Sequence, residues 1–510
     1  MSVSGYNRVT KVNTWLIILI QTGDQMDYQL FFEEDDALYY QILQQLIRHH
    51  GQRVSEAQLQ DQFSLTPYRL HKAITTINND LMTISNADNP IYLDEPEKGI
   101  LRGNQITTVA LQKVGLIYLQ RSLMFVVFEY HYIYAHQSSK TDYMKEHFIS
   151  NATFYHAESR MKKIIKQLDF SHTVVSKSLT STEYMTRLHL FQLYYTAYNG
   201  IDSPFSDLDP LITMLIDQLK AVFDISYTPT RLNKLSIFLK LWIIRVTGEN
   251  PVATNLLTDI PQSLVDQLQA IRALLAKEYL INVSDDELDY LYTFLMVQDY
   301  IAVDVTRFSP DIVPAANHLT DLFMKNVAAH HILVDPAQLT QLPLRDKISN
   351  IHIQFTTFYI EPTTFVDASQ VSFFQESYPL FDEVVSSFIM QLQRNSDFKF
   401  TAKDATNLYF SYMFALINAI PTAALVDKVY VCVDFSQGDL YTDYIVSTLQ
   451  AFNNAHIVIE ENISDHTNIY LSDFYSSFIT QPQIIWQDPP TPTDWGQLAD
   501  TIIACKKAQD

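Results

Sequence analysis

The segment Ser150–Leu168 has the periodicity of one amphipathic helix and reads SNATFYHAESRMKKIIKQL. Its apolar side chains recur every three or four positions and form a single stripe: Phe154, Ala157, Met161, Ile164, Ile165 and Leu168. Ser150 has the hydroxyl that an N-cap needs. The remaining surface of the helix carries mostly polar and basic side chains: His156, Ser159, Arg160, Lys162, Lys163, Lys166 and Gln167. A cationic helix face is unusual in a chain with 57 acidic and 35 basic residues.

The residues upstream of this segment complete a helix–turn–helix pattern. Residues 138–149 read SSKTDYMKEHFI and predict a short helix followed by a tight turn. A short helix, a turn and a second helix with a small polar N-terminus and a basic outer face are typical of a DNA-reading helix–turn–helix. The alternative is an ordinary amphipathic helix with a solvated basic face.

A similar pattern occurs earlier, at Ser64–Leu81. Thr66 followed by Pro67 is a good helix start, and Ser55 with Gln58 predicts a capped helix just before it. The apolar residues of the later helix form an inward stripe of Leu70, Ile74, Ile77 and Leu81. Its outward side carries Tyr68, Arg69, Lys72, Thr75 and Thr76. A helix from Asp36 to about Gly51 and a β-hairpin at 91–102 complete a winged helix–turn–helix pattern. Residues 15–20 and 28–32 are expected as two short paired strands.

The acidic residues are concentrated behind these two patterns. Residues 1–170 hold 16 basic and 18 acidic side chains, whereas residues 171–510 hold 19 and 39. Phosphate binding depends on local cations rather than on the charge of the whole chain, so a near-neutral front with basic faces is compatible with DNA. The acidic remainder limits non-specific binding.

The composition excludes several classes of protein. Cys432 and Cys505 are the two cysteines, so the chain has no disulfide framework, and a reducing compartment is indicated. The longest apolar runs, such as 15–20 and 123–128, are too short to span a bilayer, and no signal-peptide cleavage site follows the first. We expect a cytoplasmic protein with no membrane segment.

The pattern changes twice in the rest of the chain. Long segments rich in Leu, Ile, Tyr and Phe predict helical bundles, and similar capped helix starts at Ser284 and Thr401 suggest two related bundles. After Pro421, strands alternate with helices, which predicts a small α/β domain with a largely parallel sheet. We therefore expect a mainly α-helical chain with five domains: 1–103, 104–186, 187–300, 301–423 and 424–510.

This order of domains resembles the Mga family of Gram-positive virulence regulators. The resemblance rests on four stretches and on domain order: Ser64–Leu81, Ser150–Leu168, Arg187–Tyr198 and Lys428–Phe435 with the turn that follows it. It implies two winged helix–turn–helix domains, two regulatory domains of the sugar phosphotransferase system (PTS), and a C-terminal domain like the B component (EIIB) of a sugar phosphotransferase. It also implies a cytoplasmic transcription regulator that forms homodimers through the C-terminal domain and is tuned by histidine phosphorylation from the PTS phosphocarrier protein.

The phosphoacceptor candidates are His189, His318 and His331. His189 lies between two leucines, where a packed histidine is the commoner outcome, and His318 is expected to start a helix after Pro314. His331 follows His330 near an expected helix end, where an imidazolium favours the helix dipole. The pattern around His352 indicates a core or edge position.

We find no motif of an enzyme. There is no Walker A sequence, Gly-x-Gly-x-x-Gly, His-Glu-x-x-His, Cys-x-x-Cys or Gly-x-Ser-x-Gly. Cys432 lies between valines in an expected strand, so we expect it to be buried and inert, and Asp434 and Asp439 in the next loop would repel phosphate. The sequence therefore predicts no catalytic site, no metal site and no cofactor, and a C-terminal domain that has lost phosphotransfer.

The expected DNA contacts divide by side-chain chemistry. The cations would contact phosphates: Arg69, Lys72, Arg160, Lys162, Lys163 and Lys166. The other polar and aromatic side chains are placed to read base edges or shape: Thr66, Tyr68, His71, Thr153, His156 and Ser159. The alternative function is an interaction protein of the PTS or an RNA-binding antiterminator-like regulator. RNA readers of that kind begin with a β-rich domain, whereas the first 186 residues here are expected to be mostly helical.

Overall fold

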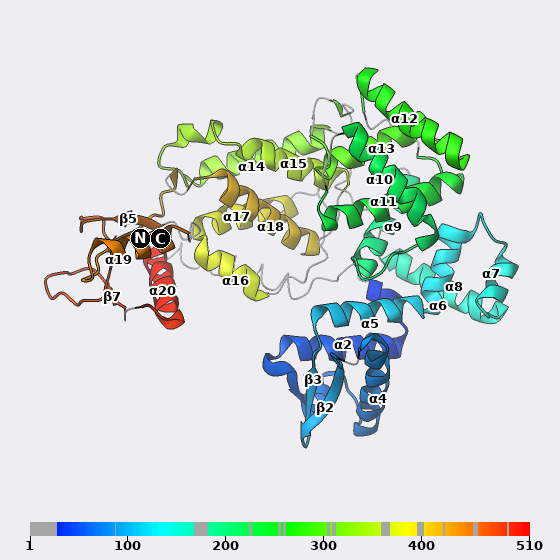
Figure 1. The fold of residues 1–510 in the computed structure, drawn as a ribbon, viewed down its shortest axis with the longest axis horizontal. Coiled ribbons are helices and arrows are strands. Elements are labelled where there is room, and N and C mark those ends of the chain that lie inside the picture. The colour runs from blue at the N-terminus through cyan, green and yellow to red at the C-terminus, as the bar shows by residue number, and fades with distance from the viewer. Residues whose placement is uncertain are drawn as a thin grey trace. The chain divides into compact units, whose positions relative to one another are not determined.

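The computed structural model describes residues 28–509, except for 87, 168–181, 224–226, 253–256, 259–261, 303–306, 309–312, 359–367, 395–401, 422–423, 452–456 and 487–488. The chain divides into two compact units, whose described residues are 28–308 and 313–509 (Figure 1). Both units are mainly helical, and the second also contains a small parallel sheet. The expected mainly α-helical class is thereby confirmed.

Residues 28–104 combine helices with a three-stranded antiparallel sheet of order β1-β3-β2. The elements are a 3₁₀ turn at Tyr28–Phe31, α2 (Glu34–Arg48), a 3₁₀ turn at His50–Gln52, β1 (Arg53–Ser55), α3 (Glu56–Gln62), α4 (Pro67–Ile84), β2 (Tyr92–Glu97) and β3 (Ile100–Asn104). The expected strand at 28–32 is wrong, because this segment turns so that Tyr28 and Phe32 pack edge-to-face against Tyr40. Its expected partner, 15–20, lies outside the described residues.

The next part, residues 108–167, is entirely helical. It consists of α5 (Thr108–Gln120), α6 (Leu123–Glu129), a π-helical segment (Tyr130–Tyr134), α7 (Lys140–Glu146) and α8 (Asn151–Gln167). Arg121, in the link between α5 and α6, forms ion pairs with Asp36 of α2 and, at 3.0 Å, with Asp80 of α4. This arginine therefore ties the first group of helices to the second.

The first unit ends in a bundle of longer helices with a buried ionic network. Its helices are α9 (Thr182–Tyr198), α10 (Asp209–Phe223), α11 (Pro229–Thr247), α12 (Gln262–Tyr279) and α13 (Asp285–Val297), with a 3₁₀ turn at Ser206–Leu208. Arg187 is 2% exposed and binds Glu287 through two bonds of 2.7 and 2.8 Å. Arg245 binds Glu183 and donates to the Tyr132 carbonyl at 2.6 Å, so the bundle is bonded to the π-helical segment.

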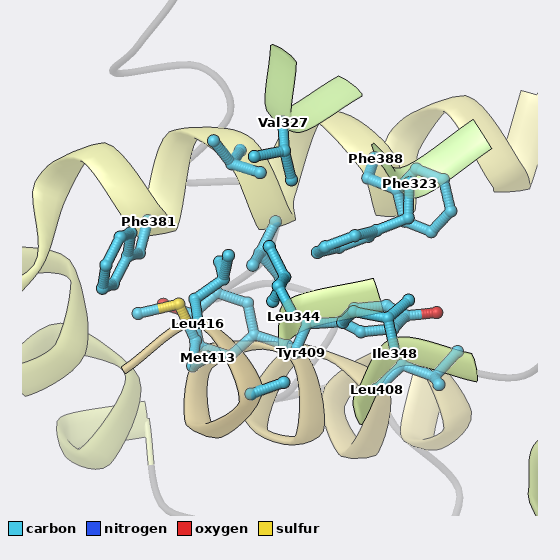
Figure 2. Packing of buried hydrophobic residues seen from close by; sticks show 14 of the residues in the cluster. Phe323, Val327, Leu344, Ile348, Phe381, Phe388, Leu408, Tyr409, Met413 and Leu416 are labelled. Carbon is cyan, nitrogen blue, oxygen red and sulfur yellow. The ribbon is translucent and has the colours of Figure 1, made fainter. Parts of the chain in front are cut away.

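The second unit begins with another helical bundle. Its elements are α14 (Val313–Ala329), a 3₁₀ turn at Pro336–Thr340, α15 (Leu344–Thr356), α16 (Ala368–Ser377), α17 (Pro379–Arg394) and α18 (Ala402–Ala419). Figure 2 shows Phe323, Ile348, Phe388 and Tyr409 among the apolar side chains that these helices bury in one core. The burial of this core, rather than helix propensity, provides most of the stability of such helices.

The C-terminal part combines a small parallel sheet with helices, as expected. Its strands are β4 (Val429–Val433), β5 (Ile457–Glu460), β6 (Ile469–Ser472) and β7 (Gln483–Ile485), and its helices are α19 (Asp439–Ala451) and α20 (Pro492–Gln509). All strand pairs are parallel, in the order β5-β4-β6-β7. The three valines of β4 are buried on one face of the sheet and Cys432 is buried on the other, as in other parallel sheets.

Of the helices that the structure describes, none alone is long and apolar enough to cross a membrane. Two consecutive helical stretches, Thr108–Gln120 and Leu123–Tyr134, have the length and composition for it together but are bent by 72° at the break between them.

Candidate nucleic-acid interface

Two helix–turn–helix units, α3–α4 and α7–α8, match residue for residue at a constant offset of 84. Ser55 caps α3 by accepting a 3.1 Å bond from the Gln58 amide, and Ser139 caps α7 by accepting a 3.2 Å bond from the Asp142 amide. Each first helix is seven residues long. The same local sequence chemistry, a serine N-cap before a short helix, therefore starts both units.

The turns of the two units have the same backbone. In the first, the Leu65 amide donates to the Gln60 carbonyl at 2.9 Å, and in the second the Ile149 amide donates to the Met144 carbonyl at 2.8 Å. The residue before each of these amides adopts a left-handed conformation, with φ of 52° at Ser64 and 55° at Phe148. This is the usual way in which a helix ends in a tight turn.

The second helices also start and pack alike. The Thr66 hydroxyl accepts from the Arg69 amide at 3.3 Å, and the Ser150 hydroxyl accepts from the Thr153 amide at 3.2 Å. The buried stripes correspond at the same offset: Leu70, Ala73 and Ile77 in α4, and Phe154, Ala157 and Met161 in α8. The expected caps and inward faces are thus confirmed, except that Ile74, Ile164 and Ile165 are only partly buried, and Leu168 lies outside the described residues.

The outer face of α4 is open to solvent. Tyr68, Arg69, His71 and Lys72 are all exposed, and Tyr68 is 78% exposed. The hairpin is fixed beside this helix, because the Asn78 side chain exchanges two bonds, of 2.7 and 3.0 Å, with the backbone of Leu93 in β2. Thr66 is exposed too, but its hydroxyl already serves the cap.

The outer face of α8 contains a shallow hollow of about 420 Å³, lined by Tyr155, Glu158, Ser159, Lys162 and Lys163. Thr153 and His156 are exposed on the same helix. The side chain of Lys166 lies outside the described part of the chain. Three of the expected DNA-contacting residues, Ser159, Lys162 and Lys163, therefore share one concave surface.

Sequence reasoning missed two residues in this hollow, Tyr155 and Glu158. Lys140, at the start of α7, places its ammonium 3.8 Å from the centre of the Tyr155 ring and 4.1 Å from that of Phe154, and these cation–π contacts fix the ring beside the hollow. The available signal was the helical spacing of Tyr155 with Ser159 and Lys162, which puts the three on one face.

Glu158 shares its carboxylate between two basic partners. Its Oε1 lies 2.9 Å from Nε2 of His131 and 3.1 Å from Nζ of Lys162. Burial lowers the pKa of His131, and the neighbouring Glu158 opposes that shift. The positive charge that the hollow presents therefore depends on the protonation of His131.

Arg160 has a structural partner. Its guanidinium donates to Glu33, just before α2, at 2.8 Å, and both side chains are one-third exposed. The expected phosphate contact by Arg160 stays a prediction, but this side chain also links α8 to the first group of helices. Lys162 and Lys163 are fully on the outer face and better placed for a ligand.

The phosphoacceptor candidates lie in different surroundings. His318 is exposed, but it lies in the second turn of α14 and does not start that helix, because the helix already begins at Val313 with Pro314 in its first turn. His331 is exposed just after α14, with φ of 50°. His189 is partly buried on α9.

His352 is a core residue, as expected. It is fully buried on α15, 2.8 Å from both the Thr320 and the Tyr412 hydroxyls, and burial lowers its pKa to about 3. Because Thr320 donates its own proton to the Ala316 carbonyl, it accepts from Nδ1–H of His352. This histidine is neutral and inaccessible to a phosphoryl donor.

Cys432 is buried in β4, as expected. Burial and the neighbouring carboxylates Asp434 and Glu460 raise the pKa of its thiol to about 11, so it is held as an unreactive thiol. Among the described residues, no group of three or more His, Cys, Asp or Glu side chains is placed to hold a metal ion.

No protein-family model matches the chain, and no curated protein sequence matches it.

Proposed function

We propose that this chain is a DNA-binding transcription regulator that reads duplex DNA with α4 and α8. The observation that carries the proposal is the repetition of the helix–turn–helix unit at a constant offset, with the same caps, turn and buried stripe. In such units the N-terminal part of the second helix enters the major groove. Both second helices leave that part exposed.

The distribution of charge supports binding of a polyanion such as DNA. Arg69 and Lys72 on α4 and Lys162 and Lys163 on α8 are exposed, whereas the rest of the chain carries the excess of acidic side chains. Phosphate contacts of this kind supply the sequence-independent part of the affinity. A merely solvated basic face would not need to recur on two helices with matching turns.

The finer architecture follows the resemblance to the Mga family. Residues 28–104 would be a winged helix–turn–helix, with β2 and β3 as the wing, and α5–α8 would form a second helix–turn–helix domain. The bundles α9–α13 and α14–α18 would be PTS regulatory domains, and β4–α20 an EIIB-like domain. The exposed His318 and His331 are the sites most open to the PTS phosphocarrier.

A homodimer through the C-terminal domain is part of this proposal. Large apolar side chains are exposed after two neighbouring strands: Leu440 and Tyr444 on α19, and Phe474, Tyr475 and Phe478 after β6. The two segments are joined by a 2.9 Å bond from the Ser436 amide to Asp473. A second copy of the chain would remove these side chains from water.

The decisive test compares two double variants in a salt titration of duplex-DNA binding. Lys162→Ala/Lys163→Ala removes two cations from the hollow on α8. The control, Lys220→Ala/Lys277→Ala, removes one partly exposed and one exposed cation from the first bundle and changes the net charge equally. We expect the first variant to bind more weakly on all sequences and to reduce the slope of log K against log salt by about two, and the control to match the wild type. Equal binding by both variants, or no binding by the wild type at low salt, would refute the proposal.

Phosphorylation has a separate test. The full chain is incubated with the phosphocarrier protein and its kinase, and phosphohistidine is mapped by mass spectrometry. We expect phosphate on His318 or His331. Substitution of the phosphorylated residue, by His318→Ala or His331→Ala, should remove that phosphohistidine. Absence of phosphohistidine from every site would refute regulation by the PTS while leaving DNA binding unaffected.

A further inference from the structure

Phe148 occupies an unexpected place in the second helix–turn–helix unit. It lies in the turn between α7 and α8 and is 96% exposed, the highest value among the large apolar side chains in the described part of the chain. Its φ of 55° is left-handed, a conformation that glycine adopts at much lower cost than phenylalanine. The turn requires this backbone, because the Ile149 amide must reach the Met144 carbonyl.

The turn does not require the phenyl ring. The equivalent turn of the first unit places Ser64 at the same position with nearly the same φ of 52°. At 96% exposure the ring of Phe148 gains almost nothing from burial, so the folded chain carries both the backbone strain and an apolar ring in water. The turn accounts for the backbone conformation, and a ligand that covers the ring would account for a phenylalanine at this position.

The location indicates what that ligand is. Phe148 precedes Ser150, the residue that caps α8, by two positions, and the first turn of α8 is the part expected in the groove. The exposed side chains of Lys145 and Thr153 flank it along the chain. An apolar ring at the edge of a cationic groove-binding helix matches the C5-methyl group of thymine, the apolar group that the major groove displays.

We propose that Phe148 is a specificity-determining residue whose ring contacts a thymine methyl group in the DNA site read by α8. This inference rests on the proposed function, and it adds a base preference that the cations of α8 do not provide. It also explains why the second unit has a strained aromatic residue where the first has serine.

The test separates folding from binding. Phe148→Gly removes the ring and relieves the left-handed strain, so we expect it to melt at or above the wild-type temperature. Ser64→Gly is the matched control, because it relieves the same strain in the first unit without removing a ring. A lower melting temperature of Phe148→Gly than of the wild type would overturn the strain argument.

The binding arm uses duplexes that the wild-type full chain selects from a random-sequence library. Each thymine of the selected duplex is replaced in turn by uracil, which lacks the methyl group. We expect one such replacement to weaken wild-type binding by about fourfold, the worth of one buried methyl group, and to have no effect on Phe148→Gly. Ser64→Gly should respond to uracil as the wild type does.

The outcomes distinguish the two levels of the proposal. If the wild type selects and binds no duplex, the proposed function fails and this inference fails with it. If the wild type binds, but no uracil replacement distinguishes it from Phe148→Gly, the thymine contact is refuted and DNA binding stands. A loss of binding by Phe148→Gly that is equal on thymine and uracil duplexes also refutes the contact with the methyl group.

Discussion

Ionisation of Glu129 should loosen the contact between α6 and the first bundle above neutral pH. Glu129 ends α6 and is partly buried, and the buried Tyr194 of α9 donates to its Oε1 at 2.8 Å. Burial raises the pKa of this carboxyl to about 7, although the bond from Tyr194 opposes the shift. Because the folded pKa lies above the unfolded one, the stability from this group is complete below about pH 4.5 and is lost as pH rises through 7.

The size of the effect follows from the shift. A rise in pKa from the ordinary 4.5 to about 7 corresponds to about 3 kcal/mol at full ionisation. Solvent access at a partly buried group reduces this to about 2 kcal/mol. Glu129→Gln keeps a carbonyl acceptor for Tyr194 and carries no charge, so it should be unaffected by pH over this range.

Hydrogen exchange of peptides from α6 and α9 measures the effect locally. Wild type and Glu129→Gln are compared at the same pH, which cancels the intrinsic pH dependence of exchange. We expect nearly equal protection at about pH 4, below the unfolded pKa, and about thirtyfold greater protection in the variant at about pH 8.5, the ratio that corresponds to about 2 kcal/mol. Glu146→Gln, at an exposed position on α7, is the control for the loss of one negative charge. The same difference between wild type and Glu129→Gln at both pH values would refute the reasoning.

Three further predictions follow from buried or paired groups. Burial lowers the pKa of His131, so its protonation as the pH falls below the ordinary range of an imidazole should add positive charge beside the hollow and strengthen DNA binding, measured by fluorescence anisotropy. His131→Gln should remove that pH dependence, and an unchanged dependence would contradict the prediction. Arg245→Met should lower the free energy of unfolding of the first unit by about 3–5 kcal/mol, measured by calorimetry, because it leaves the Glu183 carboxylate with one partner fewer. A decrease of less than about 1 kcal/mol would contradict this prediction. In the native chain, Cys432 should react with iodoacetamide at about pH 7.5 far more slowly than an unhindered thiol does, as followed by mass spectrometry. After denaturation it should react at the normal rate. Rapid labelling of the native chain would show that the thiol is accessible.

Local sequence was sufficient wherever the interaction is local. The hydroxyls of Ser55, Thr66 and Ser150 bond to amides three residues ahead, so the helix starts were predictable from residue type and spacing. The continuous apolar run in β4 likewise predicted a buried parallel strand, and the structure confirms it. The five-domain division and the DNA contacts stay predictions.

Misassigned segments had a tertiary cause. The aromatic residues at 28–32 have strand-like composition, but they fold as a turn because Tyr40 and Tyr118, distant in the sequence, receive their rings. His318 was expected at a helix start, but the helix begins one turn earlier. A single sequence gives helix type more reliably than helix boundaries.

By itself, the sequence determined that two amphipathic helices with basic outer faces each follow a short capped helix, because capping and periodicity act over three or four residues. Only the tertiary structure decided which side chains of these units form pairs and which stay exposed. It paired Arg160 with Glu33, 127 residues away, it placed Glu158 between His131 and Lys162, and it left the ring of Phe148 exposed on a strained turn. Such pairings depend on which helices pack together, and that is set by burial of the whole core rather than by any one segment.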